Sequence, residues 1–310
     1  MFLSFFQVCF VIVTAMTKLN LIKEVKSRKI RLILFILLGL LSILLTSGLC
    51  LYNGAGKGQL IVNFFDVGQG DAALIRLPSG KVILIDGGPD NIILRRLGEY
   101  LPFYQRRLDY VFYSHYHADH IGGLVELIKR YEVKNLVYAP GDYSSALLDA
   151  LDQSVAAAQV NDMPLASTAQ INFSDDCFLN LLNPRVLQVP SDENNSLVIY
   201  LNCAEKKFLF SGDNNYKVEQ ALLALSNDPK NCHLFRCDLR VDVFKASHHG
   251  SKTANSEEFL LALQAQLLVI SAGADNRFGH PHATILERAK SLGIIVKRTD
   301  LAGTISIGGS

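Results

Sequence analysis

The sequence of 310 residues is poor in cysteine, has no excess of charge of either sign, and contains no fixed-period repeat or low-complexity tract. Six cysteines are too few for a small scaffold held together mainly by disulfides. Thirty basic and 29 acidic residues exclude a polybasic chain that coats nucleic acid through charge alone. Apolar residues are abundant, at 49% of the total, which excludes a wholly disordered protein.

The charge is unevenly distributed along the chain. Residues 1–57 contain seven lysines and arginines and one acid, so residues 58–310 contain 23 basic and 28 acidic residues. Nucleic-acid binding by this second part would therefore need a local basic patch, a bound metal or a partner. The candidates for a basic patch are Arg95, Arg96, Arg106, Arg107 and Arg277.

Residues 32–52 form a run of 21 residues without a charge. About 20 apolar residues are enough for a helix to cross the hydrocarbon core of a membrane. A buried core helix would have a polar face, and the apolar region of a cleaved signal peptide would be shorter. The run therefore predicts an uncleaved membrane anchor, and residues 1–57 are predicted to be anchor and linker.

The flanks of this run predict its orientation. Residues 1–16 are also apolar but short for a span, so they are either a first short helix or an over-extended start before Met16. The stretch between the two runs holds six basic residues against Glu24 alone, and the positive-inside rule places it in the cytoplasm. The expected location is the cell membrane, with residues 58–310 extracytoplasmic.

Residues 58–310 are predicted to form one layered α/β domain. Apolar runs bounded by turn residues predict strands at 60–65, 72–77, 82–85, 108–113, 135–138, 178–182, 196–201, 207–210, 241–246, 267–271, 294–298 and 304–307. Apolar residues at three- and four-residue spacing predict helices at 123–131, 144–158, 218–225, 256–264 and 284–291. The elements do not alternate regularly, which argues against a plain doubly wound sheet.

Seven of the eight histidines lie in two groups, and the first group predicts a metal site. His115, His117, Asp119 and His120 follow an apolar strand directly. Imidazoles and carboxylates are ligands of first-row metals, and this compact spacing suits two adjacent ions better than one. Three further polar segments follow predicted strands or open a helix. They contain further possible ligands, namely Asp213, the pair His248 and His249, and His280.

Together these segments resemble the metallo-β-lactamase superfamily, and within it the ComEC-type competence branch. The superfamily pattern is His115-x-His117-x-Asp119-His120. The branch is indicated by the segments Asp-Val-Gly-Gln-Gly-Asp at 66–71, Ser-His-His-Gly-Ser at 247–251 and Gly-His-Pro at 279–281. The resemblance implies an αββα sandwich with two metals at one edge, bound by His115, His117, Asp119, His120, Asp213 and His248.

One departure concerns the first metal. The wider superfamily has a further histidine before the bridging aspartate, but this chain has none from Ile121 to Cys232. Asn195, or its neighbour Asn194, is the expected substitute. Because an amide oxygen is a harder and weaker ligand than imidazole, we expect Mn²⁺ to be favoured over Zn²⁺, although Zn²⁺ stays open.

Other residues are assigned supporting or catalytic roles. Asp66, Asp71 and Asp86 are either carboxylates that orient metal-bound imidazoles or simply turn residues. Asp119, His249, Ser251 and His280 are the candidate catalytic residues, with helix capping as the alternative for Ser251 and His280. Lys245 and Lys252 are candidate sources of positive charge, or ordinary surface residues. Cysteines 177, 203, 232 and 237 either pair or remain free thiols.

The resemblance implies a membrane-anchored, metal-dependent phosphodiesterase or nuclease that acts on DNA, with single strands favoured, during DNA uptake. At most two membrane segments are too few for a DNA channel, so a separate channel protein is an expected partner. The alternatives are a hydrolase of a small-molecule ester or lactam on the same fold, and a non-catalytic accessory subunit of a DNA-uptake complex.

Overall fold

The computed structural model describes residues 28–54, 58–141, 143–183, 195–228 and 238–308. The chain divides into two compact units, Met1–Gly58 and Gln59–Ser310. The described part of the first unit is helix α2 (Arg28–Gly54), on which most of the described large apolar side chains are exposed. Within the part of the chain that is described, no helix combines the length and apolar character that a membrane crossing requires. The membrane segment predicted at 32–52 is therefore not confirmed, and residues 1–27 lie outside the described residues.

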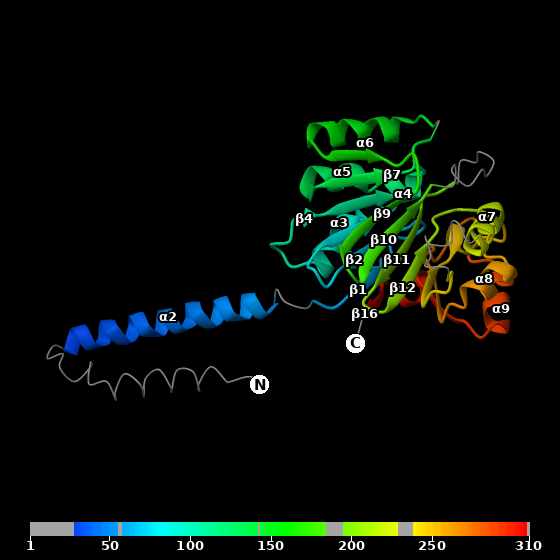
Figure 1. Cartoon of the computed structure of the whole chain (residues 1–310). Coiled ribbons are helices and arrows are strands. Elements are labelled where there is room, and N and C mark those ends of the chain that lie inside the picture. Colours follow the sequence, from blue (N-terminus) through cyan, green and yellow to red (C-terminus); the bar gives the residue numbers. More distant parts are fainter. Residues whose placement is uncertain (1–27, 55–57, 142, 184–194, 229–237, 309–310) are drawn as a thin grey trace. The chain divides into compact units, whose positions relative to one another are not determined.

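The second unit is built on two mixed sheets, each with seven described strands (Figure 1). The strands of the first sheet, in spatial order, are β16 (Ile305–Gly308), β1 (Ile61–Phe64), β2 (Ala73–Arg76), β3 (Val82–Ile85), β5 (Tyr110–Tyr113), β7 (Asn135–Tyr138) and β8 (Asn161–Pro164). Those of the second are β15 (Ile295–Arg298), β14 (Leu267–Ile270), β13 (Val243–Lys245), β12 (Lys206–Phe210), β11 (Val198–Cys203), β10 (Cys177–Leu182) and β9 (Ala169–Ser174). A small parallel pair joins β4 (Arg107–Leu108) to β6 (Glu132–Val133).

The two sheets pack face to face because their strands are apolar on both sides. Along β2, Ile75 lies in the core between the sheets, whereas its neighbour Leu74 lies in the core under the helices. Along β13, Val243 and Phe244 divide in the same way. This period-two division explains why these strands are continuous apolar runs in the sequence.

Helices cover both outer faces (Figure 1). Helices α3 (Ile92–Tyr100), α5 (Leu124–Arg130) and α6 (Ala146–Ala157) contribute apolar side chains to the core on the first sheet. Helices α7 (Tyr216–Asn227), α8 (Glu257–Leu263) and α9 (Ala283–Ser291) do so on the second sheet. The layers are therefore helix, sheet, sheet, helix, which is the αββα sandwich implied by the resemblance.

Several elements were missed by the sequence patterns. Strand β8 has the sequence Asn-Asp-Met-Pro, is fully exposed, and pairs only at the edge of its sheet beside β7. Its composition disfavours a strand, and its proline is tolerated because an edge strand leaves one side unpaired. Helix α3, the short helices α4 (Ala118–Ile121) and α10 (Thr299–Ala302), strand β9, and the two-residue strands β4 and β6 were also not predicted.

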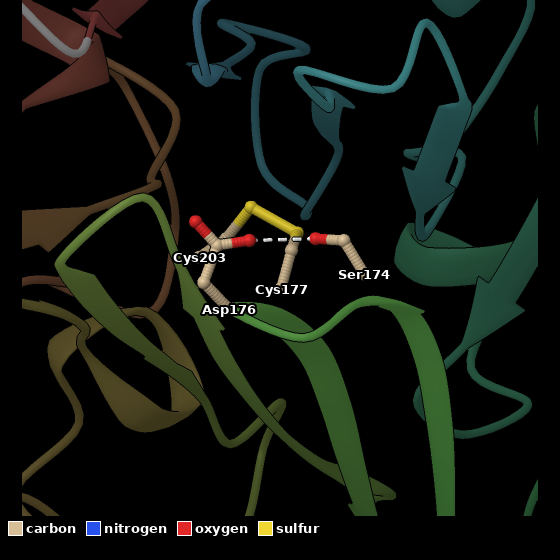
Figure 2. Close-up of a disulfide and its surroundings, with 4 residues drawn as sticks. All are labelled: Ser174, Asp176, Cys177 and Cys203. Carbon is tan, nitrogen blue, oxygen red and sulfur yellow. Dashed lines mark hydrogen bonds between the residues drawn. A yellow bond between two sulfur atoms is a disulfide. The ribbon is translucent and has the colours of Figure 1, made fainter.

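A disulfide joins Cys177 and Cys203, which face each other on the neighbouring strands β10 and β11 (Figure 2). Both cysteines are buried against the core between the sheets. Beside them, the hydroxyl of Ser174 donates a hydrogen bond to Asp176 (Figure 2). The two alternatives left open for these cysteines are thus resolved as a pair, and Cys232 and Cys237 lie outside the described residues.

Candidate metal centre

The histidines and aspartates gather where β3, β5, β12 and β13 end. β3 and β5 run parallel, as do β12 and β13, so within each sheet the two carboxyl ends lie at the same edge. The chain leaves β5 at Ser114, passes His115 and His117, and turns into the single helical turn of α4, which begins after His117. This turn places Asp119 and His120 on the same short segment as the first two histidines.

His120 is held between two carboxylates of distant segments. Its Nδ1 lies 3.1 Å from Oδ2 of Asp86, and its Nε2 lies 3.4 Å from Oδ1 of Asp213. The other oxygen of Asp86 accepts a 2.7 Å hydrogen bond from the backbone N–H of Ser114. Asp86 therefore orients the ring, in agreement with its predicted supporting role, and directs Nε2 toward the centre of the cluster.

His115 is oriented by two hydroxyls that the sequence analysis did not single out. Its Nδ1 lies 3.1 Å from Oγ of Ser114 and 3.2 Å from Oγ of Ser196, and its Nε2 lies 3.9 Å from Oδ2 of Asp213. Ser196 also accepts a hydrogen bond from the backbone N–H of Asp213. Gly212 allows this close approach, since a Cβ at its position would lie 2.5 Å from Cβ of Ser196. Ser114 directly precedes His115 in the sequence and Ser196 opens a predicted strand, and these positions were the available signal.

His248 and His249 both reach Asp213 because of an unusual backbone. They occupy the short 3₁₀ segment η3 (Ser247–Gly250) with positive φ angles of 49° and 53°, in the sparsely populated left-handed region. Nε2 of His248 lies 3.7 Å from Oδ2 of Asp213, and Nε2 of His249 lies 3.6 Å from the same atom and 3.2 Å from Oδ2 of Asp119. His249, Asp119, His120 and Asp213 therefore form a compact group, in which one possible ligand atom from each residue lies within 4.8 Å of the others. His249, which was predicted to be catalytic, is thus at least as well placed for a metal as His248.

Asp71 and Lys245 form a buried ion pair behind this group. The ammonium of Lys245 donates to Oδ2 of Asp71, and Oδ1 of Asp71 lies 3.3 Å from Nδ1 of His249. Lys245 is therefore buried and is not a surface residue, and its positive charge is paired with the carboxylate of Asp71. Gly70 (φ +148°) brings this loop against the metal motif, since a Cβ there would lie 2.3 Å from the carbonyl oxygen of Asp119.

Two predicted residues have other contacts. Asp66 accepts hydrogen bonds from Arg96 and from the backbone of Gly68, so the described contacts make it a turn residue with an ion-pair partner. The hydroxyl of Ser251 contacts Thr253 within its own loop. It does not cap α8, whose first turn is capped by Ser256.

The remaining predicted residues lie at the rim. His117 and His280 line a cavity of about 310 Å³, and Asp119, Asp213 and His249 line the same cavity. His280 does not provide a side-chain cap for α9. Asn195 directly precedes Ser196, so it lies at the His115 side of the cluster, and its role as a ligand stays a prediction. Asn194 lies outside the described residues.

The charges of the cluster suit a cation. Burial lowers the pKa of His115 well below its ordinary value, so that this imidazole is neutral. Burial also opposes a charge on His249, but the carboxylates of Asp213 and Asp71 raise its pKa to about 10. Burial raises the pKa of Asp213, but His249 and His120 hold it well below its usual value. The metal-free cluster thus keeps Asp213 ionised and an extra proton on His249, and a divalent cation would take the place of that proton.

The donor set fits a divalent metal ion. Nε2 of His115, Nε2 of His120 and Oδ1 of Asp213 are buried and make no hydrogen bond among the described residues, and both nitrogens lie within 3.9 Å of the Asp213 carboxylate. Leaving one such group unsatisfied costs about 1–3 kcal/mol, so three at one point indicate a ligand. When bound, a divalent metal ion would supply hydroxide at neutral pH and stabilise negative charge on an oxygen of the substrate.

Comparison with known proteins agrees with this geometry. Residues 65–273 match the model of the metallo-beta-lactamase superfamily. The chain is 30% identical over 266 residues to ComE operon protein 3 of Bacillus subtilis, covering 79% of this chain and 32% of that protein. It is 27% identical to Recombination protein 2 of Haemophilus influenzae, covering 86% and 31%. The chain thus spans about a third of the length of these curated relatives.

A solved structure shows the same fold. The crystal structure of the metallo-beta-lactamase fold protein YhfI from Bacillus subtilis superposes with a TM-score of 0.56 at 12% identity, covering 81% of this chain and all of that one. The resemblance to ComEC-type competence proteins is confirmed by the curated relatives. Because the family model matches about two thirds of the chain, the chain belongs to the metallo-β-lactamase superfamily.

Proposed function

We propose that this protein is a metal-dependent phosphodiesterase that cleaves DNA, with single strands preferred, in connection with DNA uptake. The observation that carries the proposal is the convergence of unsatisfied, buried ligand atoms from His115, His120 and Asp213 beside Asp119 and His249. DNA as the substrate is supported by the curated relatives, which include Competence protein ComA of Neisseria gonorrhoeae, 25% identical over 86% of this chain.

In this proposal the cluster would hold two divalent ions, and Asp213 would be a ligand available to both. His115 and His117 face one ion with Asn195, and Asp119 and His120 face the other with His248 or His249. The mixture of imidazole and oxygen ligands suits Mn²⁺ or Zn²⁺.

His280 is the proposed group that meets the substrate or leaving group. It lines the cavity, and Nδ1 of its ring is buried without a hydrogen-bond partner among the described residues. Burial, and then the charge of His249, lower the pKa of His280 to about 4, so the ring is neutral at pH 7. A neutral imidazole can hydrogen-bond a phosphate oxygen or accept a proton.

The proposed location is the cell membrane, with the hydrolase domain outside the cytoplasm and a separate channel protein as its partner. The uncharged run at 32–52 and its basic flank support an anchor. The disulfide between Cys177 and Cys203 supports an oxidising compartment. Protease treatment of intact cells tests the proposal, because digestion of the domain is expected and full protection contradicts it.

The activity is tested with the purified full chain, stripped of metal and resupplied with Mn²⁺, Zn²⁺ or Mg²⁺. End-labelled single- and double-stranded DNA are the substrates, Asp119→Ala is the inactive variant, and Asp149→Ala, an exposed carboxylate on α6, is the matched control. Metal-dependent cleavage that only Asp119→Ala loses supports the nuclease. Metal bound without any cleavage of DNA contradicts it and directs attention to small esters or an accessory role.

A further inference from the structure

The cavity over the cluster has an aromatic wall that metal binding does not use. Its lining residues are Gln69, His117, Asp119, Asp213, His248, His249, Phe278 and His280. Phe278 is the single apolar residue in this set, and 50% of it is exposed. The described residues leave half of this ring uncovered, although it lies beside a charged site.

The loop that presents Phe278 is fixed by hydrogen bonds. The side-chain amide of Asn276 donates to the carbonyl oxygens of Gly273 and His280, at 2.8 and 2.6 Å. Its Oδ1 accepts from the backbone N–H groups of Phe278 and His280. The Phe278 ring also stacks on the His280 ring, with centroids 5.7 Å apart and planes inclined by 22°. The exposed ring is therefore held in place at the cavity.

A second exposed ring, that of Tyr143, lies beside His117. Tyr143 is 37% exposed and stacks on Tyr116 with centroids 4.5 Å apart and planes inclined by 9°. Its ring makes an edge contact with His117, 6.3 Å between centroids. Tyr116 covers one face of the Tyr143 ring. Exposed aromatic rings thus lie beside His117 and beside His280.

Positive charge accompanies one of these rings. The guanidinium carbon of the exposed Arg277 lies 5.1 Å from the centre of the Phe278 ring. An exposed guanidinium can exchange this weak contact for a phosphate. Aromatic rings together with arginine form the usual binding surface for unpaired nucleotides, because every base has a stacking face and every linkage has a charge.

We propose that Phe278 and Tyr143 are stacking platforms for the nucleobases on either side of the scissile phosphate, and that Arg277 binds a neighbouring phosphate. The inference rests on the proposed hydrolysis of DNA and specifies its substrate as single-stranded, because bases within a duplex cannot turn out to stack on protein rings without unpairing. It also attributes the preference for single strands to loop residues that are not proposed metal ligands.

The test compares Phe278→Ala and Tyr143→Ala with the ring-retaining variants Phe278→Trp and Tyr143→Phe in the full chain. Phe103→Ala is the matched control, because Phe103 is 86% exposed and precedes β4 and β5 at the end opposite the metal ligands. The substrates are a single-stranded oligonucleotide and an abasic oligonucleotide of the same length. Binding of both by metal-free protein is measured in parallel by fluorescence anisotropy.

Each alanine variant is expected to raise KM and Kd for the base-bearing strand by about 5- to 150-fold, with kcat nearly unchanged. The abasic strand should bind and react equally with all variants, and the ring-retaining variants should behave as the unaltered protein. Equal losses on both strands, or no loss beyond that of Phe103→Ala, overturn the inference.

The two proposals fail in distinguishable ways. If the unaltered protein binds the base-bearing strand through these rings but cleaves neither strand, then the nuclease proposal fails and the stacking inference stands. If it cleaves DNA with the same constants in all variants, then only the stacking inference fails. If it neither binds nor cleaves DNA, both are overturned.

Discussion

Replacing Lys245 by methionine tests the buried ion pair that joins the two sheets behind the metal ligands. The side chains of Lys245 and Asp71 are 5% and 8% exposed, and 174 residues separate them in the chain. Removing one partner of a buried pair costs about 3–5 kcal/mol, because the other charge stays buried without compensation. Asp71 keeps its contact with His249, so we expect the lower end of this range for the metal-free protein.

Urea unfolding followed by circular dichroism measures this cost. The double variant Asp71→Asn with Lys245→Met removes both charges, so it should be more stable than the single variant by about 1–3 kcal/mol. The matched control is Lys81→Met, since Lys81 is 41% exposed beside Asp109 and its loss should cost at most about 1 kcal/mol. A single variant no less stable than this control, or a double variant with no recovery, would refute the reasoning.

The other predictions concern the disulfide, the metal and one glycine. Replacing Cys177 and Cys203 by alanine should lower the free energy of unfolding by about 3.5 kcal/mol, from closure of a loop of 26 residues, and an unchanged urea midpoint would contradict this. Because Asp213 and Asp71, against burial, raise the pKa of His249 to about 10, metal must displace a proton. Calorimetry should therefore show proton release and tighter binding as pH rises from 6 to about 9, and pH-independent affinity would count against His249 as a ligand. The metal-free protein should lose stability as pH rises from about 6.5 through about 10, because the folded pKa lies above the unfolded one; a flat unfolding midpoint over this range would argue against a protonated His249. Gly70→Ala should displace the Asp119 backbone and weaken metal binding at least tenfold in a metal titration, whereas Gly80→Ala, in an open turn, should leave the affinity unchanged; equal affinities in both variants would refute the close approach.

Much of the sandwich could be predicted from apolar runs, since a strand buried on both faces differs in composition from its turns. Of the strands that were missed, β8 and β9 lie at sheet edges, where burial is partial and composition carries less information, and β4 and β6 have only two residues each. Helix α3 was missed although its buried residues Ile93 and Leu97 have the four-residue spacing of a helix.

The local part of the candidate site could also be predicted. His115, His117, Asp119 and His120 lie within six residues, so their proximity follows from the chain itself. The orienting hydroxyls of Ser114 and Ser196 were missed because serine is common, and Ser196 lies 81 residues from His115 in the sequence. The disulfide was left undecided for the same reason, since pairing requires the register between β10 and β11.

The sequence by itself determined the layered α/β class, the metal chemistry of the histidine motif and the family, because periodicity and short motifs are properties of neighbouring residues. Only the tertiary structure decided that Asp86 supports His120, that Lys245 is buried against Asp71, and that Asp66 pairs with Arg96. It also decided that the left-handed turn at η3 brings His249 as well as His248 to Asp213. Such contacts join segments that are distant in the sequence, and their geometry exists only once the strands and loops have packed together.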